Sequence, residues 1–356
     1  MRGSRVTIKD IARELSISPS TVSRALKDHP DISAQTKIAV NELARKLQYE
    51  PNAIALSLKN SFSKTLGLII PEIVHYFFSS VISGIEDVAY DAGFNVIICQ
   101  SNESYEREVK NLHTLVSGRV DGLLVSVSKE TTNFDHFKHV VDTGIPIVFY
   151  DRVCNEILTD RVIVDDADGA FKAVDHLASV GCKKIVHYAA SQHLMIGRNR
   201  AMGYREAMRK NNLPFTEEMI IRCDSFDCAK KMTENLLKEK NPPDGIFAVN
   251  DLTAIGAMLA IKEAGLDIPN DIAVVGFSNG NYATMTQPSL TTVEQHGYDI
   301  GKIAINLLLD RLRADHEYEA ITRMIRTDLV VRESTKRQLK IDQATSSPGL
   351  SGMKQV

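Results

Sequence analysis

Apolar positions along the first fifty residues recur at the spacing of short helices. We expect Thr7 to cap a first helix, with Asp10 at its third position. A second helix opens with Ser18 as its N-cap and Pro19 at its first position, where the missing N–H is not needed. Ser33 caps a third helix. Its predicted inner positions are Ile38, Leu43, Ala44 and Leu47. The pattern predicts an all-α bundle that contains a helix-turn-helix.

From residue 64 onward, continuous apolar runs alternate with amphipathic helical segments. The runs cover residues 66–70, 95–99, 122–127 and 145–150, and then 162–164, 184–188, 245–248 and 272–275. Buried apolar strands that alternate with helices predict doubly wound parallel sheets. Two series of four or five strands predict two lobes that face each other across a cleft. The expected fold class is therefore α/β, with an N-terminal all-α headpiece before the two-lobed core.

Charge is divided unevenly between these two parts. Residues 1–64 carry 11 Lys and Arg against 6 Asp and Glu, whereas the whole chain of 356 residues has a net charge of −3. A basic small domain beside an acidic larger one favours a polyanion such as DNA at one end only.

Composition and motifs argue against several other classes of protein. No apolar run is long enough to span a membrane and the N-terminus lacks a secretory signal, so we expect a cytoplasmic protein without membrane contact. The five cysteines are scattered without metal-ligand spacing and are expected to be reduced thiols. We find no dinucleotide fingerprint, P-loop or hydrolase triad, so no enzyme activity, cofactor or metal is expected.

The outer face of the second helix carries candidate DNA contacts. Its polar positions are Pro19, Ser20, Thr21, Ser23 and Arg24. A recognition helix enters the major groove by its N-terminal end, and Arg24 is the best candidate for a bidentate contact to guanine. The hydroxyls that suit phosphate oxygens are those of Thr7, Ser23, Ser33 and Thr36. A small helical bundle with solvated hydroxyls has the same periodicity, so the pattern alone leaves both interpretations open.

Three sequence stretches decide between these interpretations. Residues 6–12 (VTIKDIA) and 17–26 (ISPSTVSRAL) closely resemble the headpiece of the LacI/GalR family of bacterial regulators, and residues 49–59 (YEPNAIALSLK) resemble its hinge. The resemblance continues to about Ser334. It departs at Ser16, where the family usually has glycine in the turn. A left-handed backbone at this position is less favourable for serine than for glycine.

The resemblance implies that the hinge folds on operator DNA and that paired hinge helices push a leucine into the minor groove. By position this leucine is Leu58, with Lys59 beside it, and Tyr49 and Asn52 belong to the same DNA-binding set. The alternative is a flexible linker with one incidental apolar residue.

Domain borders follow from the same resemblance. Residues 1–50 are expected to form the headpiece, 51–63 the hinge, 64–335 the effector-binding and dimerisation core, and 336–356 a disordered tail. Within the core, one lobe is expected to comprise about 64–163 and 294–323, and the other about 164–293 and 324–335.

A cleft between two such lobes binds a small molecule through the loops at the strand ends. The family's effector positions correspond in this sequence to Phe77, Phe78, Ser126, Asp151, Asp165, Arg198, Arg200, Phe226, Asn250, Ser278, Asn279 and Gln295. The arginines suit ligand hydroxyls or carboxylates, and Phe226 suits the apolar face of a sugar ring. The alternatives are that Asn250 is only a helix cap and Phe226 only a core residue.

One departure from the family bears on the ligand. Many members have an aspartate where this chain has Ser278 and Asn279, and the loss of that carboxylate would leave Arg198 and Arg200 less compensated. This reasoning favours an acidic or phosphorylated sugar over a neutral one.

Taken with the resemblance, the sequence predicts a homodimeric repressor that binds a palindromic operator and a small polar effector, a sugar or a sugar derivative. Effector binding would shift the lobes and so change operator affinity. Two competing functions are a DNA-binding regulator controlled by a partner protein and a sugar receptor that binds no DNA. The retained cleft residues argue against the first, and the headpiece argues against the second.

Overall fold

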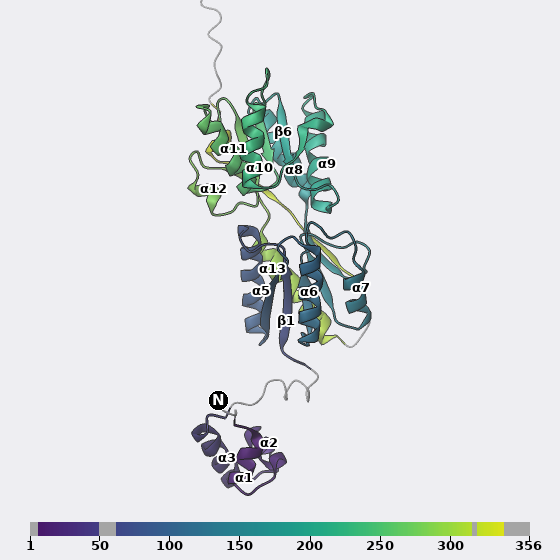
Figure 1. Ribbon diagram of the computed structural model, residues 1–356, viewed down its shortest axis with the longest axis vertical. Coiled ribbons are helices and arrows are strands. Elements are labelled where there is room, and N and C mark those ends of the chain that lie inside the picture. Colours follow the sequence, from purple (N-terminus) through teal and green to yellow (C-terminus); the bar gives the residue numbers. More distant parts are fainter. Residues whose placement is uncertain (1–5, 50–61, 315–318, 338–356) are drawn as a thin grey trace, which may run out of the picture. The chain divides into compact units, whose positions relative to one another are not determined.

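The computed structural model describes residues 6–49, 62–314 and 319–337. The chain divides into two compact units, residues 1–65 with 119–121 and residues 66–118 with 122–356. The first unit holds a small helical headpiece and the second an α/β core of two lobes (Figure 1). The predicted fold class is thereby confirmed. Within the described ranges, no helix combines the length and apolar character needed to cross a membrane.

Three helices form the headpiece: α1 (Ile8–Glu14), α2 (Pro19–Leu26) and α3 (Ala34–Lys46). The hydroxyl of Ser18 caps α2 and that of Ser33 caps α3, as the sequence predicts. At the start of α1, the carboxylate of Asp10 accepts hydrogen bonds from the N–H and the hydroxyl of Thr7. Ser16 has a φ of 54°, the left-handed conformation anticipated for this turn.

The core of the headpiece contains side chains from all three helices. They are Ile11, Ala12, Val22, Ala25, Val40, Leu43 and Ala44. The expectation for Ile38 is wrong, because this side chain is 59% exposed. Val40 takes the inner position instead. Positions two residues apart lie on nearly opposite faces of a helix, so Ile38 and Val40 cannot both point inward.

The first lobe is built on a six-stranded sheet. In spatial order its strands are β11 (Thr322–Ile325), β5 (Asp160–Val164), β4 (Ile147–Tyr150), β3 (Gly122–Val125), β1 (Thr65–Ile70) and β2 (Asn95–Gln100). Its helices are α5 (Tyr76–Asp91), α6 (Tyr105–Ser117), α7 (Asp135–Asp142) and α13 (Gly297–Arg313). Helices α5 and α13 pack closely because Gly84 has no side chain: a Cβ there would lie 2.1 Å from the carbonyl oxygen of Tyr298.

The second lobe repeats this plan around another six-stranded sheet. In spatial order its strands are β12 (Asp328–Val330), β10 (Thr291–Glu294), β9 (Ala273–Phe277), β8 (Gly245–Ala248), β6 (Ile185–Ala189) and β7 (Ile220–Arg222). Its α-helices are α8 (Asp166–Ser179), α9 (Met195–Lys210), α10 (Phe226–Leu236), α11 (Asp251–Glu263) and α12 (Tyr282–Met285), and two short 3-10 helices span Glu217–Met219 and Glu333–Thr335.

One strand departs from the expected parallel arrangement, since β12 pairs with β10 in antiparallel fashion. The reason lies in the connection. β11 ends on the cavity side of the first sheet, and only residues 326–327 separate it from β12. The chain therefore enters the second sheet at the edge where the carboxyl ends of its parallel strands lie, and β12 runs in the opposite direction to β10.

The chain passes between the lobes three times, after β5, after β10 and after β11. The borders expected after residues 163, 293 and 323 lie one or two residues before the ends of these strands.

Cysteine chemistry also differs from expectation. Cys223 and Cys228 form a disulfide with their Cα atoms 5.6 Å apart, so the prediction of reduced thiols is wrong for this pair. The start of α10 turns the chain back after β7, which brings the two residues together. Cys99, Cys154 and Cys182 are free cysteines.

Candidate functional site

The headpiece presents the polar face of α2 to solvent. Pro19, Ser20 and Arg24 are exposed, while Thr21 and Ser23 are half-buried. The hydroxyl of Ser18 lies 2.7 Å from that of Ser20 and 2.8 Å from that of Thr21. These contacts order the N-terminal turn of the helix. Arg24 has no ion-pair partner among the described residues, so its guanidinium is available to a ligand.

The remaining predicted DNA contacts of the headpiece lie at helix starts and at its end. Thr7 and Ser33 are exposed, and the hydroxyl of Ser33 lies 2.8 Å from that of Thr36. Tyr49 is half-buried against the headpiece core. The other three predicted contacts lie outside the described residues. They are Asn52, Leu58 and Lys59.

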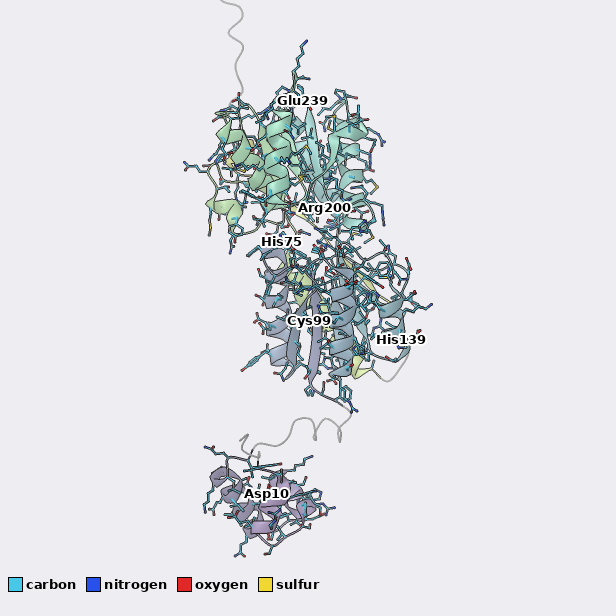
Figure 2. The ribbon with its side chains drawn as sticks, viewed as in Figure 1. Asp10, His75, Cys99, His139, Arg200 and Glu239 are labelled. Atoms are coloured by element: carbon cyan, nitrogen blue, oxygen red, sulfur yellow. A yellow bond between two sulfur atoms is a disulfide. The ribbon has the colours of Figure 1, made fainter. Side chains whose placement is uncertain are left out.

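A cavity of about 340 Å³ lies between the two lobes of the core. Its walls come from loops just beyond the carboxyl ends of strands in both sheets, where the loops of parallel strands converge. Asp151 follows β4 of the first lobe, and Asn250 and Ser278 follow β8 and β9 of the second. Figure 2 labels two lining residues, His75 and Arg200, one from each lobe.

Aromatic rings form the apolar part of this cavity. Phe77 and Phe78 enter from the first turn of α5, with ring centroids 5.2 Å apart in an edge-to-face arrangement. Phe226 enters from the other lobe at the first position of α10. Such rings offer flat apolar surface to a small ligand, such as the face of a sugar ring.

Two polar side chains in the cavity have spare hydrogen-bonding capacity or an unusual charge state. The Oε1 atom of Gln295 accepts a hydrogen bond from Ser278, whereas its buried Nε2 atom has no partner among the described residues. An unpaired buried donor is unfavourable, so it suits a ligand acceptor. Burial raises the pKa of Asp151 to about 6, although Arg152 and a hydrogen bond from Ser126 oppose this shift.

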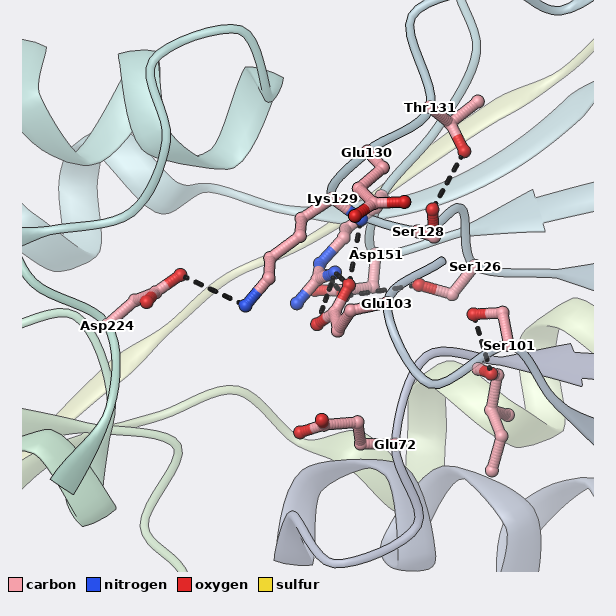
Figure 3. A network of polar contacts seen from close by, with 12 residues as sticks. Glu72, Ser101, Glu103, Ser126, Ser128, Lys129, Glu130, Thr131, Asp151 and Asp224 are labelled. Carbon is pink, nitrogen blue, oxygen red and sulfur yellow. Dashed lines mark hydrogen bonds and ion pairs between the residues drawn. The ribbon is translucent and has the colours of Figure 1, made fainter. Parts of the chain in front are cut away.

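Most of the charged groups in the cavity are already paired. Arg152 donates two hydrogen bonds to the carboxylate of Glu103, at 2.7 and 2.9 Å. Lys129 of the first lobe lies 3.9 Å from Asp224 of the second, so an ion pair spans the cavity (Figure 3). Arg200, which is 4% exposed, contacts Asp166 through two of its nitrogens, each 2.8 Å from Oδ1.

Comparisons with known proteins agree with both halves of this architecture. The profile for bacterial regulatory proteins of the lacI family matches residues 7–52, and that for a periplasmic binding protein-like domain matches residues 174–335. The chain is 35% identical over 335 residues to the ribose operon repressor of Halalkalibacterium halodurans, covering 93% of this chain and 97% of the relative. The chain belongs to the LacI family.

Solved structures of LacI-family proteins have the same fold. A lac repressor dimer bound to operator and the anti-inducer ONPF is 25% identical, with a TM-score of 0.80 over 93% of this chain and 99% of that one. A LacI-family regulator from Enterococcus faecium with bound ribose is 28% identical, with a TM-score of 0.68 over 76% of this chain and 98% of that one. This chain is accordingly a DNA-binding transcriptional regulator and not an enzyme.

The cavity between the two lobes is lined by most, but not all, of the predicted effector residues. Those that line it are Phe77, Phe78, Asp151, Arg200, Phe226, Asn250, Ser278 and Gln295. Ser126 is fully buried behind the lining and donates its hydroxyl to Asp151 at 3.4 Å.

Three predicted effector residues lie away from the lining. Asp165 accepts a hydrogen bond from the N–H of Asp168 and caps α8. Asn279 is not part of the lining: its side chain donates a hydrogen bond to Glu294 and accepts one from Arg332. Arg198 lines a different cavity, and its guanidinium donates to backbone carbonyls at residues 192 and 193.

Asn250 is a helix cap, and it also lines the cavity, where its contact to an effector stays a prediction. Its Oδ1 atom accepts the N–H of Thr253 and caps α11, while its Nδ2 atom donates to the carbonyl of Asp224 on the cavity wall. Next to it, burial raises the pKa of Asp251 to about 7. The Asp251 carboxylate accepts hydrogen bonds from the N–H of Gly280 and the hydroxyl of Thr292, and so holds the loop that carries Ser278.

Sequence reasoning missed several charged residues of the cavity. They are Glu72, Glu103, Lys129, Arg152 and Asp224. Each follows the carboxyl end of a strand within four residues, namely β1, β2, β3, β4 and β7. Scanning the ends of the predicted strands for charged residues would have found the first four. Asp224 would still have been missed, because β7 lacks the continuous apolar run that predicts a buried strand.

Pairing of Arg200 also corrects the argument about the ligand's charge. From the sequence we expected this arginine to lose a counter-charge where the family's aspartate is replaced by Ser278. Asp166 supplies that compensation from the start of α8, and the Arg200 guanidinium also lies 3.7 Å from the centre of the Phe277 ring. The premise that favoured an acidic or phosphorylated sugar therefore does not hold for Arg200.

Proposed function

We propose that this LacI-family chain is a homodimeric transcriptional repressor whose operator affinity is set by a small neutral sugar bound between the lobes. The lac repressor relative is a dimer on its operator, which supports a palindromic site and one headpiece per half-site. Since operator DNA lies in the cytoplasm, we place the protein there. Arg24 is proposed to contact guanine, and Leu58 to act as the minor-groove wedge.

The charges of the cavity carry the proposal of a neutral ligand. Its acidic residues are Glu72, Glu103, Asp151, Asp224 and Asp227, and its basic residues are Lys129, Arg152 and Arg200. An anionic ligand would meet more carboxylates than cations, and both arginines are paired. Hydroxyl groups, by contrast, can donate to carboxylates and accept from the free Nε2 of Gln295. A neutral polyol fits this set of donors and acceptors.

Coupling to DNA follows from the position of the ligand between two lobes. A ligand that contacts both lobes stabilises one of their relative arrangements, and operator affinity changes by the difference in ligand affinity between the arrangements. The existing contacts across the cleft include the Lys129–Asp224 ion pair and the hydrogen bond between His193 and the carbonyl of Lys129. A bound sugar competes with or adds to these contacts.

Fluorescence anisotropy with labelled genomic fragments from near the gene tests this function. The ligand panel consists of D-ribose, other neutral pentoses and hexoses, a uronate and ribose 5-phosphate. We expect selective, salt-dependent DNA binding that one neutral sugar shifts and the anions do not. A shift by the uronate or the phosphate alone would contradict a neutral ligand. Selective DNA binding that no compound shifts would favour a protein partner instead.

A matched pair of variants ties the response to the cavity. Gln295→Ala removes the free donor. We expect it to raise the sugar concentration that gives half of the anisotropy change by about tenfold, in line with the loss of one buried hydrogen bond. Gln287→Ala changes the same residue type outside the lining and should leave the response unchanged.

A further inference from the structure

The disulfide joins the two ends of one segment of the cavity wall. Four consecutive residues lie between Cys223 and Cys228 and all of them line the cavity: Asp224, Ser225, Phe226 and Asp227. No other run of four consecutive residues lines the cavity in the described part of the chain. The covalent link thus closes a loop on the longest continuous part of the lining.

Both ends of this loop are attached to the framework of the second lobe. The N–H of Cys223 donates to the carbonyl of Ala189 at the end of β6, at 2.9 Å. Cys228 lies in the first turn of α10, which Ser225 caps. The disulfide therefore sets the distance between the end of a strand and the start of a helix.

Only non-covalent contacts restrain the residues inside the loop. Asn250 donates to the carbonyl of Asp224 at 3.2 Å, and the side chain of Asp224 makes the long ion pair with Lys129 of the other lobe. The backbone of Phe226 packs against α11 at Gly256, where a Cβ would lie 2.3 Å from the Phe226 carbonyl oxygen.

From this arrangement we propose that Cys223 and Cys228 are a thiol–disulfide modification site that controls effector affinity, with a low-molecular-weight disulfide as the reactant. The inference rests on the proposed effector function of the cavity. Disulfides in cytosolic proteins of mesophiles are usually transient and redox-sensing, which fits a regulatory pair better than a structural one.

The exposure of the two cysteines and the N-terminal N–H groups of α10 indicate which thiol reacts first with the small disulfide. Cys223 is 1% exposed, whereas Cys228 is half-buried in the first turn of α10, where backbone N–H groups stabilise a thiolate. The Cys228 thiolate attacks one sulfur of the small disulfide, forming a mixed disulfide and releasing one small thiolate. Cys223 then loses its proton and its thiolate attacks Cys228 Sγ, which releases the second small thiolate. The two protons from the protein pass to the two small thiolates, so one small disulfide is reduced as the protein pair is oxidised.

In the reduced protein only non-covalent contacts and the ligand order residues 224–227, whereas the disulfide restrains them before the ligand binds. Preorganisation of a binding loop raises affinity by removing this ordering step from the binding reaction. We expect the oxidised protein to bind its effector about tenfold more tightly than the reduced protein.

The test uses the full-length protein equilibrated at a series of ratios of glutathione to glutathione disulfide. Peptide mapping by mass spectrometry measures the Cys223–Cys228 link, and hydrogen exchange measures protection of residues 222–230 without any ligand. Calorimetric titration with D-ribose then compares affinity in the two redox states. Cys228→Ser is the test variant, and Cys99→Ser is its control because Cys99 lies in β2, away from the cavity.

We expect the disulfide to form in the wild type, to protect residues 222–230, and to strengthen D-ribose binding, with Cys228→Ser insensitive to redox and Cys99→Ser like the wild type. Two results overturn the proposal: a folded protein that forms no link even in excess glutathione disulfide, or a link that leaves the affinity for a sugar that binds unchanged. If D-ribose binds in neither state while exchange still responds, the choice of sugar fails and the redox site stands.

Discussion

The buried pair of Arg200 and Asp166 offers the sharpest test of how charge is arranged in this core. Their side chains are 5% and 3% exposed, and Arg200 Nε and Nη2 each lie 2.8 Å from Asp166 Oδ1. Arg200→Met keeps much of the side-chain volume but leaves Asp166 as an uncompensated buried charge. Removal of one partner from such a pair destabilises a protein by about 3–5 kcal/mol. We expect that loss in the free energy of unfolding at pH 8.

The loss should depend on pH in a defined direction. Burial raises the pKa of Asp166, and Arg200 lowers it. Without Arg200 the pKa rises further, so the folded variant takes up a proton more readily than the unfolded chain does. A raised folded-state pKa means that stability decreases as pH rises through the range between the two pKa values. Arg200→Met is therefore expected to be closer to the wild type at pH 5 than at pH 8.

A double variant separates charge from packing. Asp166→Asn in the Arg200→Met background removes the orphaned carboxylate, and we expect it to recover at least about half of the lost stability. Urea unfolding followed by circular dichroism at 222 nm is the suitable assay, because the chain contains no tryptophan. The unfolding curve of the core is fitted separately from that of the headpiece, since the two units need not unfold together.

Two outcomes would refute this reasoning. A loss below about 1 kcal/mol at both pH values would mean that Asp166 does not depend on Arg200 for its charge. If the same variant also lost binding of a uronate that the wild type binds, Arg200 would be a ligand contact, and the neutral-sugar proposal would fail with it.

Three further substitutions test other parts of the structure. Arg24→Ala should weaken selective DNA binding by about 1–3 kcal/mol in anisotropy titrations. Arg13 is also exposed, and Arg13→Ala should leave this binding unchanged. Equal losses in the two variants would contradict a base contact by Arg24. Burial raises the pKa of Asp151 from 3.8 to about 6, so Asp151→Asn should stabilise the core above pH 6 by on the order of 3 kcal/mol. This gain should shrink toward pH 4. A difference in the free energy of unfolding that does not change with pH in urea titrations would refute the prediction. Gly256→Ala places a Cβ 2.3 Å from the Phe226 carbonyl oxygen, so it should reduce the free energy of unfolding by about 1–3 kcal/mol and weaken sugar binding. If calorimetric titration gave the same sugar affinity as the wild type, α10 would have to move away without cost to the cavity.

Local sequence was sufficient where a feature depends on nearest neighbours. The N-caps at Ser18 and Ser33 follow from residue type and spacing alone, whereas the left-handed turn at Ser16 was expected only from the family resemblance. The central strands were recognisable because both of their faces are buried, which makes continuous apolar runs such as residues 66–70. Strands β7, β11 and β12 lie at or near sheet edges, are short and partly polar, and lack that signal.

Other features depend on residues far apart in the chain, and these only the tertiary structure decided. Asp166 lies 34 residues before Arg200, and nothing in the sequence pairs them, because an ion pair needs proximity in space and not any particular spacing. The same holds for Lys129 and Asp224, which meet because two sheets turn the carboxyl ends of their strands toward one cavity. The sequence by itself determined the family, the helix caps and the buried strands, since those depend on local chemistry and pattern. The charge of the cavity and its covalent loop were decided by packing, because only packing brings their partners together.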